Sequence, residues 1–398
     1  MKKRFIFLFL FFMLFLVSCS SKTDEYSTNK CILTVDYNLE GVELDTIEYE
    51  YASLVTLPEN NYKNFKGWVL DLNVSEVLDV GFPIYKNETL YAVYYDSTVK
   101  EEFNLNRINF KEGINNTDIE VLDRVSYSLY KDITYKVIND IVLKLDIYYP
   151  KEDKELKGVI FSYYGGGWVA GSKEATYFNL LYTSLARNGM VIVVPNYRLC
   201  NGSVIFPSPV EDCLDAIRYI VKHQDVLDID VNKMGSIGYS AGGHLALMAA
   251  FAQDYFDSYE PLKEYKFKLK FVCDYFGPAI YGKDEFSQLN LEGKFFIASY
   301  LGSLDLDNPE YEKSMPSYFL DNNKPDIIII HGTKDEVVPI SQSLILYQRC
   351  DEKGMKVKLI TVEGANHMLS AASGAASIKP SLLEIFGETS SFISESIK

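Results

Sequence analysis

The sequence predicts an α/β protein, in which a mostly parallel sheet is covered by helices on both faces, with a smaller β-rich unit before it. Short apolar runs rich in β-branched residues recur after residue 150, and helix-forming stretches separate them. The chain has 398 residues, which exceeds one ordinary domain of roughly 100–200 residues. We therefore expect one large domain and one accessory unit.

The large domain is placed at 125–398. Its predicted buried strands are the apolar runs 158–162, 190–194, 234–238, 268–273, 327–330 and 357–362. Ahead of them, a hairpin is predicted to turn at Asn139-Asp140, between strands near 133–137 and 141–148. Alternation of strand and helix after the hairpin predicts a sheet wrapped on both faces.

The accessory unit is placed at 31–96, where short strand-like runs are separated by Gly, Pro, Asn and Asp. Segments 65–68 and 89–94 resemble the β-grasp repeat of bacterial surface proteins, the internalin B-repeat type. That resemblance implies a spacer that lifts the next domain off the membrane, or a weak adhesive module that makes cell-surface contacts. Residues 97–124 are polar and weakly patterned, which predicts a linker.

The N-terminus has the pattern of a signal peptide, predicted at 1–18. Three basic residues precede the apolar run 5–17, whose 13 residues fall short of the ~20 that a spanning helix needs. The run closes on Leu-Val-Ser-Cys, which resembles a bacterial lipobox. The resemblance implies a lipid on Cys19, a tether at 19–30 and a position on the extracytoplasmic face of the cell membrane. A plain secretory signal with a chance cysteine is the alternative.

Charge and cysteine content exclude several classes of function. The formal net charge of −16, from 55 acidic and 39 basic residues, disfavours nucleic acid and anionic lipid surfaces as partners. Attachment to the membrane would therefore depend on the lipid predicted on Cys19 and not on the charge of the protein. Six cysteines stand far apart without a C-x-x-C pair, and only four histidines are present, so neither a zinc site nor a dense disulfide framework is predicted.

Ser240 is the candidate nucleophile. It lies at the centre of the G-x-S-x-G pattern Gly238–Gly242, between an apolar strand and a helix-forming run. Such a pattern predicts a nucleophile elbow, a tight turn that presents the hydroxyl above the sheet and beside the N–H groups of a helix N-terminus.

A serine hydroxyl needs a base, and His367 is the candidate. His244 is expected inside the helix packing, His223 at the end of a surface helix and His331 at a strand end where it serves local order. His367 follows a strand in a loop, where a mobile base can reach the serine. Asp335 is the predicted acid that orients this histidine, because Asp335 follows the carboxyl end of the strand 327–330. Its neighbour Glu336 is the alternative acid.

The oxyanion donors are predicted in the glycine-rich run Tyr164–Trp168, which follows the strand 158–162. We assign the backbone N–H groups of Gly166 and Gly167, with Ala241 as the third donor. A flexible glycine turn is the alternative. A dinucleotide site is excluded because the glycines miss the G-x-G-x-x-G spacing by one residue.

These motifs, together with 194–199, Phe206-Pro207 and Asp212, resemble the α/β-hydrolase superfamily, specifically carboxylesterases with an HGGGW motif. That group includes acetyl and feruloyl esterases and hormone-sensitive-lipase relatives. The resemblance covers about 125–398 and implies the α/β-hydrolase fold. Tyr164 stands where the family has histidine, and because the predicted donors are backbone groups, we expect the oxyanion hole to survive this difference.

The resulting hypothesis is a secreted, lipid-anchored serine esterase that acts on small-molecule or polysaccharide esters through an acyl-enzyme, without metal or organic cofactor. Short acyl or carbohydrate-borne acetyl and feruloyl esters are the implied substrates, and a peptidase or formamidase of the same fold stays open. The other class of function is a surface binding protein that uses the fold as a scaffold. Aromatic residues in 274–324 predict either a lid or pocket wall, or ordinary core helices.

Overall fold

The computed structural model describes residues 30–36, 43–50, 65–69, 88–94, 120–123, 127–151 and 157–398, except 176, 257–258, 304, 306 and 322. The described residues divide into two compact units, one before and one after residue 101. The predicted signal peptide, Cys19 and most of the predicted tether lie outside the described residues. In the described part of the chain, the helices fall short of the length and apolarity needed to cross a membrane.

The first unit is a small four-stranded sheet with the order β2-β1-β4-β3. Its strands are β1 (Lys30–Asp36), β2 (Asp45–Glu50), β3 (Phe65–Val69) and β4 (Glu88–Tyr94). The central pair β1/β4 is parallel, whereas β1/β2 and β3/β4 are antiparallel. The unit is therefore β-rich, as predicted, and its resemblance to a surface repeat stays a prediction.

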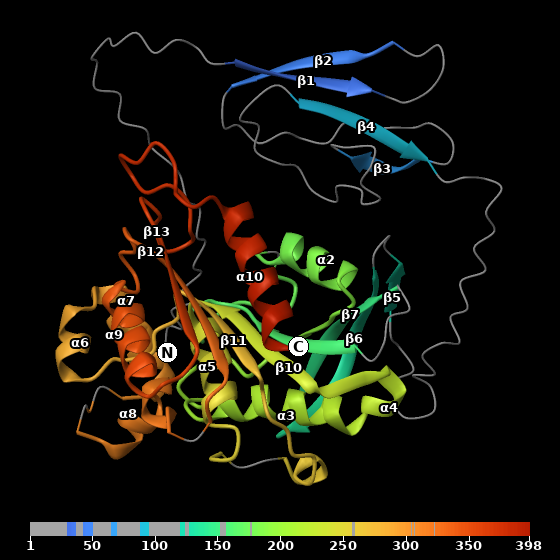
Figure 1. The fold of residues 1–398 in the computed structure, drawn as a ribbon. Coiled ribbons are helices and arrows are strands. Elements are labelled where there is room, and N and C mark those ends of the chain that lie inside the picture. The colour runs from blue at the N-terminus through green and yellow to red at the C-terminus, as the bar shows by residue number, and fades with distance from the viewer. Residues whose placement is uncertain are drawn as a thin grey trace, which may run out of the picture. The chain divides into compact units, whose positions relative to one another are not determined.

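The second unit is built on a nine-stranded sheet with the order β13-β12-β11-β10-β8-β9-β7-β6-β5 (Figure 1). Six strands form the parallel part of the sheet, in the order β9, β8, β10, β11, β12 and β13. At the other end, β9 pairs antiparallel with β7, β7 with β6, and β6 with β5. The strands are β5 (Glu120–Asp123), β6 (Tyr127–Ile138), β7 (Ile141–Pro150), β8 (Lys157–Tyr163), β9 (Val191–Pro195), β10 (Ile229–Tyr239), β11 (Phe271–Tyr275), β12 (Asp326–Gly332) and β13 (Val357–Val362).

The predicted strands and hairpin are confirmed, but several strand bounds differ. β6 begins about six residues and β10 five residues earlier than predicted, and β11 begins three residues later. Glu120–Asp123, at the end of the predicted linker, instead forms β5, because its backbone pairs with Ser128–Lys131 of β6 and extends the sheet edge. Asn139 and Asp140 form the hairpin turn with φ of 48° and 63°, a left-handed conformation that these two residue types tolerate.

Helices cover both faces of this sheet, as predicted for an α/β-hydrolase fold (Figure 1). On one face, α2 (Asn179–Arg187) and α10 (Leu382–Ser396) enclose one apolar core with the strands. On the other face, α3 (Ser208–Lys222), α5 (Ala241–Phe251) and α9 (Ser341–Glu352) enclose a second. α5 is apolar except for His244 and is entirely buried, as expected of a helix at the centre of a layered domain.

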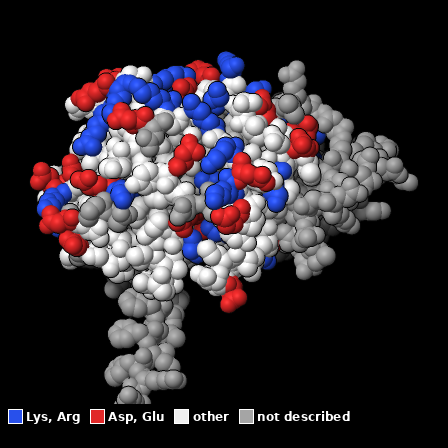
Figure 2. All heavy atoms as spheres, turned by 90° about the horizontal axis from the view of Figure 1, so that it is seen from below, with Lys and Arg blue, Asp and Glu red and all other residues white. Residues whose placement is uncertain are grey.

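Short elements complete the unit: α4 (Gln224–Leu227), α6 (Lys283–Gln288), α7 (Leu291–Leu301), α8 (Pro309–Lys313) and the 3₁₀ turns Glu260–Leu262 and Pro316–Phe319. Three of these helices, α6 to α8, fall in the aromatic-rich segment 274–324. On the face seen from below, acidic and basic side chains are interspersed among uncharged residues (Figure 2).

Candidate active site

Ser240 occupies a sharp turn between β10 and α5. Its backbone has φ 54° and ψ −125°, a conformation that costs an L residue energy and that recurs at functional sites. The flanking glycines make this turn possible, because a Cβ on Gly238 would lie 2.1 Å from the carbonyl oxygen of Gly242. A Cβ on Gly242 would lie 2.0 Å from the carbonyl oxygen of Tyr163. The G-x-S-x-G spacing therefore has a steric cause at this position.

Ser240, His367 and Asp335 lie in one hydrogen-bonded line. Nε2 of His367 is 2.9 Å from Oγ of Ser240, and Nδ1 of the same ring is 2.7 Å from Oδ2 of Asp335. Each of the three follows the carboxyl end of a parallel strand. Because these strand ends lie side by side, the three residues meet there although Ser240 and His367 are 127 positions apart. The line can move the Ser240 proton onto the imidazole while the carboxylate holds the ring in one tautomer.

Asp335 is fixed by more than His367. Its Oδ1 accepts the backbone N–H groups of Val337 and Val338, both at 2.9 Å, and Nε2 of His331 lies 3.1 Å from Oδ2. Burial favours the neutral acid, but the hydrogen bonds from the His331 and His367 rings outweigh it and hold the pKa of Asp335 well below its ordinary value. The carboxylate is therefore kept ionised beside the imidazole. Its rival Glu336 is exposed.

The rings of the other histidines have partners other than the Ser240 hydroxyl. His244 is fully buried, its Nε2 is 2.8 Å from the carbonyl oxygen of Ser314, and burial lowers its pKa to about 4. His331 is the penultimate residue of β12, and its buried ring contacts Ser343 and Val338. His223 follows α3, as predicted, but it is buried, and its Nδ1 lies 2.8 Å from the carbonyl oxygen of Tyr219.

Two residues that hold this line were missed by reasoning from the sequence. The sequence predicts only a local structural role for His331, but its ring contacts the Asp335 carboxylate. Phe276 packs against the His367 ring with centroids 4.9 Å apart, and its own φ of 45° is strained for an aromatic residue. Phe276 has no sequence signal because its contact with His367 joins segments far apart in the chain, whereas His331 precedes Asp335 by four residues, a spacing that could have indicated the contact.

The glycine-rich loop after β8 turns back beside Ser240. Gly167 and Ala241 line the same cavity as Ser240, and Gly166 and Gly167 have φ of 125° and 58°. Gly166 is not among the lining residues, and its carbonyl oxygen accepts the N–H groups of Val169 and Ala170. The N–H of Ala241 belongs to the first residue of α5, where helix amides lack intrahelical acceptors. The backbone N–H groups of Gly167 and Ala241, which line the cavity with Ser240, can hold a developing oxyanion.

The cavity beside Ser240, called here the Ser240 cavity, is small and apolar. Its free volume is about 30 Å³, and its walls include Trp168, Tyr281, Leu289, Phe296, Ile297 and Val338. Phe296 and Ile297 come from α7, so the segment 274–324 supplies a wall of the cavity. Other residues of the same helix, such as Tyr300, are ordinary buried core. Both predicted roles of this segment are therefore present.

The described residues offer no metal centre: nowhere among them do three or more His, Cys, Asp or Glu side chains gather as a ligand set.

The family follows from comparison with known proteins. A model of the BD-FAE family matches residues 145–350, more than half of the chain. The chain belongs to the BD-FAE family. The matched stretch contains Ser240 and Asp335, and His367 follows it.

Curated relatives of this BD-FAE protein include esterases. "Probable isoprenylcysteine alpha-carbonyl methylesterase ICME" of Oryza sativa subsp. japonica is 26% identical over 235 residues, covering 56% of this chain and 55% of the relative. Arylacetamide deacetylase of Oryctolagus cuniculus is 30% identical over 187 residues, covering 46% and 39%. The chain thus spans about half or less of the length of these relatives.

A solved structure described as a truncated carbohydrate esterase from gut microbiota is 25% identical to the BD-FAE chain. The match covers 70% of this chain and 99% of that one, with a TM-score of 0.57. Esterase 2 of Thermogutta terrifontis, 23% identical with a TM-score of 0.54, shares the fold. These likenesses agree with the α/β-hydrolase fold predicted from the motifs.

Proposed function

We propose that this protein is a serine esterase that hydrolyses carboxylic esters through an acyl-enzyme. The observation that carries the proposal is the Ser240–His367–Asp335 line, whose serine lines a cavity together with Gly167 and Ala241. Esterase names among the relatives and the solved structures support it.

In the proposed mechanism, Oγ of Ser240 attacks the ester carbonyl carbon while Nε2 of His367 takes the hydroxyl proton. The carbonyl oxygen becomes an oxyanion held by backbone N–H groups, each worth about 2.7–4 kcal/mol of barrier. The intermediate expels the alcohol, which takes the proton from His367, and the acyl group stays on Ser240. Water, deprotonated by His367, then releases the acid and restores the serine.

The proposed substrate has a short acyl group. A free volume of about 30 Å³ holds two or three water-sized groups, since one such group needs about 10–15 Å³. Acyl chains of about two to four carbons match this space and the apolar walls, which favours acetyl over feruloyl esters. The alcohol is proposed to be a carbohydrate, in keeping with the carbohydrate esterase of similar structure.

A fluorophosphonate probe, peptide mapping and a panel of esters test this proposal. We expect covalent labelling at Ser240 and turnover of aryl acetate and acetylated xylan in preference to methyl ferulate. Ser240→Ala should abolish labelling and turnover while the unfolding transition stays cooperative. Full activity in Ser240→Ala would refute the assignment of the nucleophile. An unlabelled, folded wild-type protein would support a binding scaffold instead, and turnover of amides alone would support a peptidase or formamidase.

We further propose secretion and lipid anchoring at Cys19, on the lipobox-like run that ends at this residue. The β-rich unit would then separate the esterase from the membrane or contact the cell surface. Expression of the full chain with radiolabelled palmitate should label the wild type and leave Cys19→Ala unlabelled and released from the membrane fraction. Equal membrane retention of both proteins would contradict the anchor.

A further inference from the structure

The loop that carries the proposed oxyanion donors is held by a neighbouring segment, Asn196–Cys200, called here the 196–200 segment. Tyr197 makes two reciprocal contacts with Tyr164, the residue that replaces the family histidine. Its hydroxyl donates to the Tyr164 carbonyl oxygen at 3.0 Å, and its N–H donates to the Tyr164 hydroxyl at 3.4 Å. The two buried rings stack with centroids 4.4 Å apart at 14°.

The same segment contacts the loop at two later points. Cys200 N–H donates to the Trp168 carbonyl oxygen at 2.8 Å, and Lys173 N–H donates to Oδ1 of Asn196 at 2.8 Å. Gly166 and Gly167 lie between the Tyr164 and Trp168 contacts. The segment therefore fixes the backbone immediately before and after both glycines.

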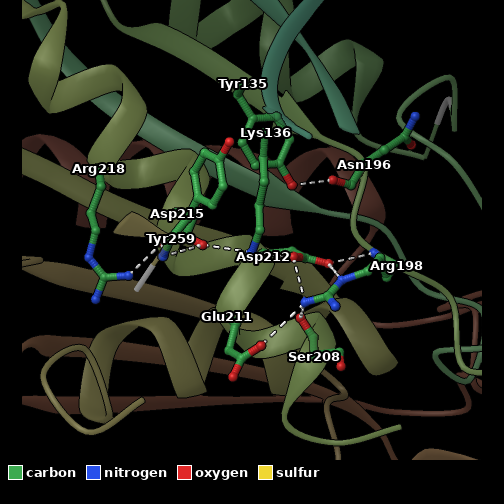
Figure 3. Close-up of polar contacts among 10 residues, drawn as sticks. All are labelled: Tyr135, Lys136, Asn196, Arg198, Ser208, Glu211, Asp212, Asp215, Arg218 and Tyr259. Carbon is green, nitrogen blue, oxygen red and sulfur yellow. Dashed lines mark hydrogen bonds and ion pairs between the residues drawn. The ribbon is translucent and has the colours of Figure 1, made fainter. Parts of the chain in front are cut away.

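A buried ion network anchors the 196–200 segment to α3 (Figure 3). Asp212 accepts three hydrogen bonds from Arg198, from its backbone N–H at 2.9 Å, Nε at 2.7 Å and Nη2 at 2.9 Å. Lys136 reaches Asp212 and Asp215 from the opposite side, both at 2.7 Å, and Arg218 pairs with Asp215 at 2.9 Å. Both aspartate side chains are fully buried. Buried, mutually paired charges of this kind hold one geometry.

We propose that Tyr197, held by the Arg198–Asp212 pair, is a positioning residue for the oxyanion donors. Donors act only when held within about 0.5 Å of the productive place. A misplacement of about 1 Å can cost about a hundredfold in rate. Tyr197 acts through the Tyr164 carbonyl and so through the loop backbone. The inference rests on the proposed esterase function.

Tyr197→Phe tests it, because phenylalanine keeps the stacked ring and removes the hydroxyl donor. We expect kcat to fall about five- to tenfold while KM changes less than about twofold. The inhibition constant of an alkyl trifluoromethyl ketone, whose adduct with serine carries an oxyanion, should rise in parallel. Arg198→Lys, which keeps the charge but loses the two-pronged contact with Asp212, should move both quantities in the same direction.

Tyr149→Phe is the matched control. Its hydroxyl also donates to a backbone carbonyl, that of Leu227 at 2.9 Å, away from the loop, and its loss should leave kcat and ketone inhibition unchanged. Unchanged kcat in a folded Tyr197→Phe protein would overturn the proposal, as would a fall in kcat without weaker ketone inhibition. A wild-type protein that hydrolyses no ester would refute the proposed function itself, and this inference with it.

Discussion

His331 and His367 approach the same atom, Oδ2 of Asp335, with ring nitrogens 3.1 and 2.7 Å away. One ring belongs to the rigid end of β12, and the other to the loop after β13. Because His331 is also held by Val338 and Ser343, it supplies a fixed second contact for the carboxylate. The orientation of His367 thus depends on a buried residue that does not contact Ser240.

Acid should reveal the ionised state of Asp335. Its folded-state pKa lies below the unfolded value of about 3.9, so its carboxylate stabilises the fold above that value, and this contribution is lost as pH falls through the folded-state pKa. Asp335→Asn should therefore be less stable than wild type at pH 7, by a margin that begins to narrow as the pH falls below about 4 and keeps narrowing toward the folded-state pKa. Urea unfolding from neutral pH into this acidic range measures the margin. Glu336→Gln, at the exposed neighbour, should show no such trend, and a constant margin for Asp335→Asn would contradict the shift.

Relief of backbone strain at Ser240 should be measurable. A non-glycine residue in such a conformation costs about 1–3 kcal/mol, whereas glycine adopts it freely at an entropic cost of about 0.5–1 kcal/mol. Ser240→Gly should therefore exceed Ser240→Ala in free energy of unfolding by about 1 kcal/mol, as judged by urea denaturation. The same pair of substitutions at Ser236, within β10, should show the opposite order. Equal stability of the two Ser240 variants would argue against strain.

Phe296 should limit acyl length. Its ring lies against Gly167, since a Cβ there would be 2.1 Å from Cδ1 of Phe296, and it lines the Ser240 cavity. Phe296→Ala should raise kcat/KM for hexanoate relative to acetate by about tenfold, because each added methylene in an apolar site is worth about 1 kcal/mol or more. The adjacent Phe295 is 60% exposed and outside the lining, so Phe295→Ala should leave the ratio unchanged. An unaltered ratio in Phe296→Ala would remove Phe296 from the specificity determinants.

Restoring the family histidine at position 164 should have a modest effect. The substitution removes the stacked ring and the acceptor for the Tyr197 N–H, but it keeps the backbone carbonyl that Tyr197 contacts. Tyr164→His should therefore lower kcat by less than about tenfold, and by no more than Tyr197→Phe does. A loss beyond about a hundredfold would mean that the tyrosine side chain itself, and not the backbone contact, holds the donors.

Local patterns account for what could be predicted. Apolar β-branched runs located the parallel strands, and glycine spacing located the turn at Ser240, because both follow from short-range sterics and burial. β5 escaped prediction because its four residues become a strand only by pairing with β6 at the sheet edge. A pocket wall in 274–324 was predicted from its aromatic residues, but the sequence of α7 alone does not reveal that Phe296 is the residue that faces Gly167.

The sequence by itself determined the alternation of strands and helices, the turn at Ser240 and the short set of polar residues from which a reactive line could be assembled. Tertiary structure decided which of them meet: it brought His367 to Ser240 across 127 positions and Lys136 to Asp212 across 76. It also paired Tyr197 with Tyr164 and set the width of the cavity. These distances depend on how separate layers pack, and no local pattern encodes the packing between segments so far apart in the chain.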